Sequence, residues 1–113
     1  MLARYAGASG DFNPIHLDED QAKAGGLPGI IAHGMLSMAL LGRGITAWVP
    51  KRNIRKFSTR FVAMARLGDT ITCKGTVRAK SEEGGEKLVE LEMIAENQDG
   101  VKTLKGSATV ALP

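Results

Sequence analysis

The sequence predicts an α+β fold in which an antiparallel β-sheet wraps around one long central helix. Residues 33–49 form an apolar run whose only fully charged residue is Arg43. A helix that is apolar nearly all round is expected to be buried nearly all round. After residue 56 apolar and polar residues alternate, which is the period of a half-buried strand. A chain of 113 residues has room for one domain, which we place over residues 1–113.

The first half of the chain predicts helices joined by irregular segments. Asp18 is expected to cap a helix, because its carboxylate can accept hydrogen bonds from the free N–H groups of the first turn. Glycines end the first two helices, and Pro50 stops the apolar one. The expected helices cover residues 1–9, 19–24 and 33–49, with irregular connections at 10–16 and 27–32.

The second half predicts four consecutive strands. Gly68-Asp69, Gly84-Gly85 and Asp99-Gly100 separate them, and Asp-Gly is a strong hairpin signal. Such short turns join antiparallel strands. In the second strand the alternation places Cys73 and Val77 on the buried face, so Cys73 is expected in the core. The expected strands cover residues 57–63, 70–80, 88–96 and 101–112.

Composition and charge exclude several classes of protein. A net charge of +3 with one Trp, one Tyr and three Phe lacks the dense basic stripe and stacking aromatics of a nucleic-acid binder. Arg43 interrupts the longest apolar run, and the first residues show no signal-peptide pattern. A single cysteine excludes an internal disulfide and a cysteine-based zinc site. We therefore expect a cytoplasmic protein that binds neither nucleic acid nor membrane.

Gly10–His16 (GDFNPIH) carries a carboxylate, an amide and an imidazole in a segment that cannot be a regular helix. It leads toward the apolar helix, so we expect Asp11 to be a buried carboxylate close to His16, a pair suited to proton transfer near neutral pH. The alternative is an Asx-turn at Asp11 and a surface histidine. Asn13 is expected to brace the pair; the alternative is a simple turn.

His33 and Gly34 open the apolar helix. The free N–H groups of a helix start, together with the helix dipole, suit a developing oxyanion. Gly34 has no Cβ, so a carbonyl oxygen could approach the backbone there. The alternative is a plain helix start with His33 bonded to nearby backbone. Ser37 lies outside any Gly-x-Ser-x-Gly motif, so we expect a packing residue with no catalytic role.

Two further groups of residues carry side chains that could bind ions. Asp11, His16 and His33 could supply three metal ligands, but their spacing is not typical of zinc, and no metal is expected. A basic patch follows the apolar helix. It is expected to be a solvated connection that complements the helix C-terminus, with contact to the phosphates of a carrier as the alternative. The basic patch consists of Lys51, Arg52, Arg55 and Lys56.

Residues 5–16 (YAGASGDFNPIH), followed by 32–36 (AHGML), resemble the hydratase-2 signature of the MaoC-like dehydratases, the (R)-specific enoyl-thioester hydratases. Arg60-Phe61-x-Ala63 and residues 67–70 (LGDT) resemble a strand and turn of the same family. The resemblance covers nearly the whole chain. It implies a hot-dog fold, in agreement with the sheet and helix expected from periodicity.

The resemblance also implies roles for single residues. Asp11 and His16 match the catalytic aspartate and histidine, Asn13 a supporting asparagine, and Gly34 the glycine whose backbone N–H forms the oxyanion hole, with His33 beside it. The implied reaction is reversible syn hydration of trans-2-enoyl thioesters of coenzyme A or acyl carrier protein to (R)-3-hydroxyacyl thioesters. No cofactor is implied. The alternatives are a non-catalytic, substrate-binding MaoC-like subunit and a hot-dog thioesterase.

Members of this family act as dimers, so a homodimer is expected, or a heterodimer with a second hot-dog chain. They usually carry a strand and most of a helix before the motif, whereas here the motif begins almost at Met1. The resemblance therefore implies that the N-terminal strand is missing and that one edge position of the sheet is unfilled. Either the reading frame is truncated or a partner chain covers the gap.

Overall fold

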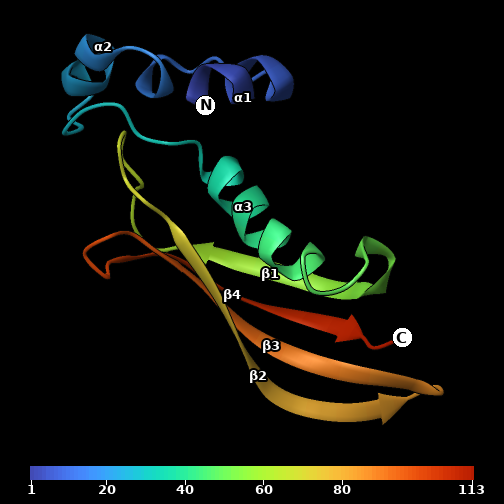
Figure 1. Cartoon of the computed structure of the whole chain (residues 1–113). Coiled ribbons are helices and arrows are strands. Elements are labelled where there is room, and N and C mark those ends of the chain that lie inside the picture. Colours follow the sequence, from blue (N-terminus) through green and yellow to red (C-terminus); the bar gives the residue numbers. More distant parts are fainter.

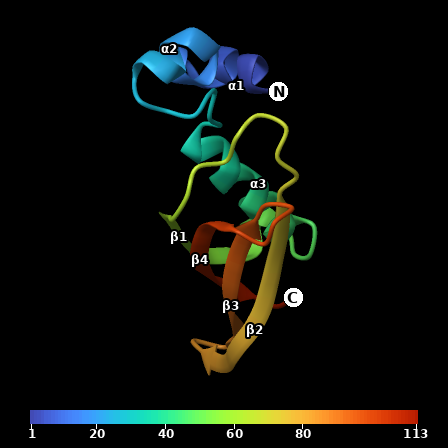
Figure 2. The ribbon, with the colours of Figure 1, turned by 90° about the vertical axis from the view of Figure 1, so that its left-hand side faces the viewer.

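A computed structural model describes residues 1–113 (Figure 1). One four-stranded antiparallel sheet curves around a central helix, and the N-terminal helices form a separate layer at one end of the molecule, as Figure 2 also shows. The expected α+β architecture is therefore confirmed. In chain order the elements are α1 (Leu2–Ser9), the 3₁₀ helix η1 (Pro14–His16), α2 (Glu19–Ala24), α3 (Gly34–Thr46), the 3₁₀ helix η2 (Lys51–Asn53), β1 (Ile54–Phe61), β2 (Thr72–Glu83), β3 (Glu86–Glu96) and β4 (Lys102–Ala111).

The strand order in the sheet is β1-β4-β3-β2, and all neighbouring pairs are antiparallel. The hairpin between β2 and β3 turns at Gly84 and Gly85, whose φ angles are 56° and 79°; Gly100, with φ 76°, turns the chain between β3 and β4. These left-handed conformations favour glycine, as the turn signals predicted. β1 is one edge of the sheet and β2 is the other.

The hydrophobic core lies between α3 and the two central strands. On β3, Val89, Leu91, Met93 and Ala95 are buried, whereas Glu90 and Glu92 between them are exposed and Ile94 is half-buried. This alternation is the one that the sequence predicts. The buried core cluster consists of Leu41, Ile45, Val49, Val89, Leu91, Met93, Ala95, Leu104, Ala108 and Val110.

The expectation that the apolar helix is buried nearly all round is wrong for this chain. α3 ends at Thr46, earlier than expected, and its buried residues are Ser37, Leu41 and Ile45, which are spaced four apart on one face. Met35 is 57% exposed. The reason is geometric: the sheet covers α3 from one side, and the N-terminal layer meets only its start (Figure 1).

The inward face predicted for β2 is also wrong beyond its first residues. Cys73 is half-buried and packs against the core, and its burial raises the pKa of the thiol, but Gly75 and Val77 are exposed. β2 is an edge strand that runs on past the end of α3, so no element covers its distal part (Figure 1). None of the helices combines the length and apolar character needed to cross a bilayer.

The N-terminal layer (residues 1–24, with α1, η1 and α2) connects to the rest of the molecule through residues 30–33. Ile31 forms a β-bridge with Arg66, and the Ala32 N–H donates to the Ala65 carbonyl at 2.8 Å. Asp69 fixes the segment of Ala65 and Arg66, because its carboxylate accepts hydrogen bonds from the Arg66 N–H at 2.9 Å and the Gln98 side chain at 3.1 Å. A short two-stranded contact thus fixes the chain just before α3.

Candidate active site

The segment that carries the acid–base pair folds into a tight turn because Asn13 supplies hydrogen bonds in two directions. Its side-chain oxygen accepts from the Ile15 N–H at 3.2 Å and caps η1, which begins with Pro14. Its own N–H donates to Asp11 Oδ1 at 3.2 Å. Asn13 therefore fixes the backbone between Asp11 and His16, without a side-chain hydrogen bond to the imidazole.

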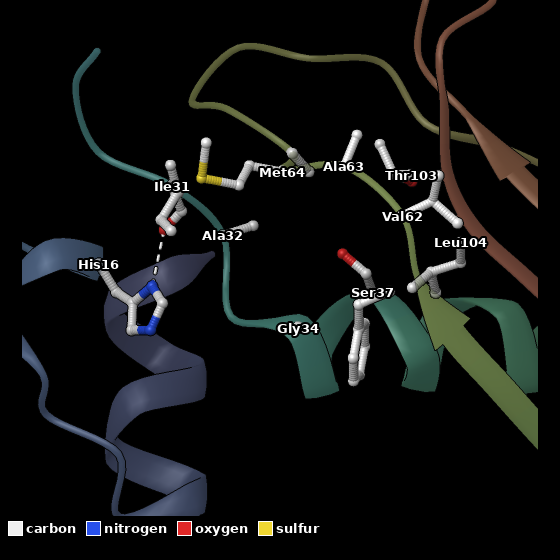
Figure 3. A pocket seen from close by; sticks show the side chains of 12 residues that line it. His16, Ile31, Ala32, Gly34, Ser37, Val62, Ala63, Met64, Thr103 and Leu104 are labelled. Atoms are coloured by element: carbon white, nitrogen blue, oxygen red, sulfur yellow. Dashed lines mark hydrogen bonds between the residues drawn. The ribbon is translucent and has the colours of Figure 1, made fainter. Parts of the chain in front are cut away.

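His16 lies under this turn and is 8% exposed. Its Nδ1 lies 2.8 Å from the Ile31 carbonyl oxygen, a contact drawn in Figure 3. A carbonyl can only accept, so Nδ1 donates, and in the neutral ring the lone pair is on Nε2. The alternative of a surface histidine is wrong, because the segment fixed by the Ile31–Arg66 bridge holds the ring inside.

Asp11 faces the free nitrogen of His16. Its Oδ2 lies 4.0 Å from His16 Nε2, while Oδ1 accepts the Asn13 N–H in an Asx-turn. The side chain is 52% exposed, so the expectation of a buried carboxylate is wrong: the turn lies on the surface of the N-terminal layer, and only one of its faces meets protein. Two acceptors at this separation suit a bridging water that donates one hydrogen to each.

His33 contacts both Asp11 and His16. It is 2% exposed, its ring stacks on that of His16 with centroids 3.9 Å apart, and Tyr5 packs edge-on at 4.8 Å. His33 Nε2 donates to the Asp11 carbonyl oxygen at 3.1 Å, which leaves Nδ1 buried without a partner. The ring thus contacts backbone, as the alternative interpretation expected, and that backbone belongs to the catalytic candidate Asp11.

Gly34 begins α3, and its N–H has no acceptor in the protein. A Cβ built at this position would lie 3.1 Å from Cε1 of Phe61, the last residue of β1. A side chain at position 34 would therefore displace the Phe61 ring by a few tenths of an ångström. Phe61 is 54% exposed, so its ring lies beside an open surface.

Gly34 and Phe61 line both of the hollows that meet at this point. One, a cavity of about 280 Å³, includes His16; the other includes Asp11. Gly34 is thus brought close to Asp11 and His16, which precede it in the sequence by 23 and 18 residues. The cavity is lined mainly by apolar side chains, as Figure 3 shows, and its residues are His16, Ile31, Ala32, Gly34, Ser37, Phe61, Val62, Ala63, Met64, Ala65, Thr103 and Leu104.

The same cluster offers possible metal ligands. Asp11, His16 and His33 each present one ligand atom, all within 4.8 Å of one another. The two imidazole planes are stacked with an angle of 22°, so their nitrogens point along parallel planes. A tetrahedral metal needs ligands that converge on one point. The arrangement therefore suits hydrogen bonding better than metal binding.

The basic patch is remote from the cavity within this chain. α3 has 13 residues and is about 20 Å long, and the patch follows its far end. Arg55 pairs with Glu86 and also donates to the Arg52 carbonyl at 2.7 Å. The interpretation as a solvated connection fits these contacts. A carrier phosphate bound to the patch would lie beyond the end of α3 opposite to Gly34.

Three contributors to the site were not found from the sequence: Tyr5, the Ile31 carbonyl and the Phe61 ring. A main-chain acceptor such as that of Ile31 leaves no trace in residue type. Phe61 could have been suspected, because it lies near the end of the predicted strand 57–63 and is an aromatic residue in a chain that has only three Phe.

Comparison with known proteins places these residues in a family context. A family model described as a MaoC like domain matches residues 1–98, which include every residue of the acid–base pair and the start of α3. The (R)-specific enoyl-CoA hydratase of Rhodospirillum rubrum is 33% identical over 111 residues, which cover 96% of this chain and 75% of that protein.

Fatty acid synthase subunit beta of Saccharomyces cerevisiae is 33% identical over 112 residues; the match covers 96% of this chain but only 5% of that much longer protein. Among solved structures, the (R)-hydratase from A. caviae involved in PHA biosynthesis superimposes with a TM-score of 0.86 at 29% identity, over 99% of this chain and 85% of that one. The sheet-and-helix architecture is thus the hot-dog fold.

Proposed function

Since the chain belongs to the MaoC-like dehydratase family, we propose that it catalyses the reversible hydration of trans-2-enoyl thioesters to (R)-3-hydroxyacyl thioesters. The observation that carries the proposal is the position of Asp11 Oδ2, 4.0 Å from His16 Nε2, while Gly34, whose N–H is free, lines the hollow of each residue. This arrangement offers two proton acceptors and an oxyanion donor.

Asp11 and His16 hold the water in this proposal. An ionised carboxylate and a neutral imidazole with its hydrogen on Nδ1 both accept, so the water donates to both and turns its lone pairs toward C3 of the substrate. One of the two groups removes a proton as the C3–O bond forms. Before the reaction, neither the Asp11 carboxylate nor His16 Nε2 carries a proton. The proton that is delivered to C2 is therefore the one removed from the water. Both additions then take place on the same face.

Gly34 stabilises the charge that moves onto the thioester oxygen. As the C3–O bond forms, the electrons of the C2=C3 bond shift toward C2 and the carbonyl oxygen, and an enolate-like charge develops there. The Gly34 N–H lies at the positive end of α3, whose dipole also favours a negative oxygen. Preorganised donors of this kind usually make a large contribution to catalysis.

The remaining parts of the proposal concern the surroundings of the site. The apolar cavity beside His16 suits an acyl chain, and coenzyme A and acyl carrier protein both remain open as carriers. We propose a dimer, either of two copies or with a second hot-dog chain, because α3 leaves apolar residues such as Met35 exposed. The cytoplasm is the proposed compartment, because Cys73 is a free thiol.

One assay separates this function from its alternatives. The purified chain is mixed with trans-2-butenoyl-CoA, and loss of the conjugated enoyl absorbance is followed together with free thiol. Loss of absorbance without thiol supports hydration, whereas release of thiol would replace it with thioester hydrolysis. Binding of the thioester without either reaction, also after addition of candidate partner chains, would favour a non-catalytic, substrate-binding subunit.

A further inference from the structure

Two hydroxyl groups line the cavity beside His16, and they differ in their hydrogen bonds. Thr103 is 1% exposed, and its Oγ1 donates to the Ala95 carbonyl at 3.3 Å. Ser37 is 6% exposed, yet its hydroxyl has no hydrogen-bond partner in the protein. Figure 3 shows the Ser37 oxygen pointing away from α3 into the cavity. Ser37 therefore presents a free polar group to whatever enters.

The free hydroxyl of Ser37 needs an explanation, because a serine within a helix can form a hydrogen bond with the helix backbone. Its hydroxyl can donate to the carbonyl one turn earlier, as Thr46 does in the same helix with the Arg43 carbonyl at 3.2 Å. The Ser37 oxygen stays open to the cavity, since His33 Nδ1 is the one buried side-chain polar atom without a partner. Ser37 forgoes the bond within the helix, which is consistent with a hydroxyl that acquires its partner when a ligand binds.

The place of Ser37 on α3 indicates which ligand atom that partner is. Ser37 follows Gly34 by three residues, so both lie on the same face of the helix, and both line the cavity. Side chains on a helix lean back over the preceding turn. The hydroxyl therefore lies over the first turn, on the side where the Gly34 N–H is free. The Ser37 hydroxyl and the Gly34 N–H therefore face the same cavity, where one ligand oxygen can meet both donors.

We infer that the Ser37 hydroxyl is the second donor of the oxyanion hole and binds the same thioester oxygen as the Gly34 N–H. The inference rests on the proposed function, because it requires a thioester in the cavity. No base forms a hydrogen bond with Ser37 Oγ, so the hydroxyl donates and does not act as a nucleophile. No bond to Ser37 is made or broken. Its hydrogen bond strengthens as charge develops on the oxygen.

The test uses two pairs of variants. Ser37→Thr and Ser37→Val have the same shape, but only the first keeps a hydroxyl; Ser37→Ala removes the group without adding volume. Thr46→Ala, on the exposed end of the same helix, is the control. We expect kcat for hydration of trans-2-butenoyl-CoA to fall about 10²-fold in Ser37→Ala and Ser37→Val. KM should change less, Ser37→Thr should stay within about tenfold of the wild type, and Thr46→Ala should be unchanged.

A second measurement does not depend on turnover. Butanoyl-CoA labelled with ¹³C at the thioester carbon cannot be hydrated, and its carbonyl stretching band reports hydrogen bonding to the oxygen. We expect the band to move to lower frequency on binding to the wild type and Ser37→Thr, and to move less in Ser37→Ala and Ser37→Val. Thermal unfolding of Ser37→Ala should match the wild type, since no protein contact is lost.

The outcomes separate the two proposals. Wild-type kcat together with a wild-type band in Ser37→Ala and Ser37→Val would overturn the role of Ser37 and leave hydration intact. A wild type that shifts the band through Ser37 but does not hydrate the enoyl thioester would support the donor role and overturn the proposed function. A band that does not move in the wild type would overturn the role of Ser37.

Discussion

The core and the N-terminal layer of this molecule are held together in different ways. The core consists of α3 and the sheet and contains a cluster of ten buried apolar residues. Within residues 1–24, only Ala6, His16 and Ala22 are buried. The layer that carries Asp11 and His16 therefore depends on specific hydrogen bonds, whereas the part that carries Gly34 depends on apolar burial.

The difference shows how Asp11 and His16 can be held in fixed positions on a layer that has few buried residues. His16 donates to the Ile31 carbonyl, His33 donates to the Asp11 carbonyl, and the bridge between Ile31 and Arg66 fixes the chain between them. Each contact sets the position of one group. Changes in the layer should thus alter activity more than stability, and changes in the core should do the reverse.

The largest effect is expected at the acid–base pair. Asp11→Asn and His16→Ala should each lower kcat by roughly 10²–10⁴, because the water loses one of its two acceptors. Circular dichroism and thermal unfolding should show a folded protein, since Asp11 is half exposed and His16 lies outside the apolar core cluster. Asp18→Asn, which keeps an effective cap on α2, is the matched control with wild-type kcat. Full activity of either site variant would remove that residue from the mechanism.

The converse effect is expected in the core. Leu41 is fully buried under the sheet, so Leu41→Ala should lower the free energy of unfolding by about 2–5 kcal/mol, as measured by urea denaturation. The KM of the molecules that remain folded should be unchanged. Val101→Ala, at a position that is 49% exposed, should change stability by less than about 0.5 kcal/mol. If Leu41→Ala changed KM and left the free energy of unfolding unchanged, the core and the N-terminal layer would not have separate roles.

Gly34 lies where the two regions meet, and an intermediate effect is expected. The Cβ of Gly34→Ala would lie 3.1 Å from the Phe61 ring, so the ring must move while the N–H remains. We expect a loss of kcat of about tenfold, smaller than the roughly 10² that a displacement of 1 Å can cause. Adding Phe61→Leu should restore part of the loss. A double variant no better than Gly34→Ala would show that the clash is not the cause.

The smallest effect concerns the support of the bridge between the regions. Hydrogen bonds from the Arg66 N–H and then from Gln98 lower the pKa of Asp69. A lowered pKa in the folded state means that the stabilisation is present above the unfolded pKa and is lost as pH falls through the folded one. Asp69→Ala should therefore cost about 1 kcal/mol at neutral pH and less in acid.

Thermal unfolding of Asp69→Ala and wild type across pH 2–7, with Glu82→Ala on the exposed end of β2 as a control, measures this difference. A gap in stability that stays constant down to the lowest pH would contradict the role of the Asp69 charge.

The sequence predicts the core better than the layer, and the reason is physical. Alternation in β3 and the turn at Gly100 are local patterns with one simple structural meaning, and both are confirmed. Burial of α3 and of the distal part of β2 depends on which surfaces another element covers, and a periodic pattern does not specify that. The turn from Asp11 to His16 was predicted as irregular, but its exposure and the Ile31 acceptor depend on tertiary contacts.

The central claim is that Asp11 and His16 add the two parts of one water to the same face of an enoyl thioester. Hydration of trans-2-butenoyl-CoA in D₂O, followed by NMR and chiral analysis of the product, tests it most directly. The account predicts the (R)-3-hydroxyacyl thioester with a single deuterium at C2, syn to the new hydroxyl, in the wild type and product formation slowed by at least about 10²-fold in Asp11→Asn. An anti product, a mixture of configurations at C3, or equal product from Asp11→Asn would contradict it.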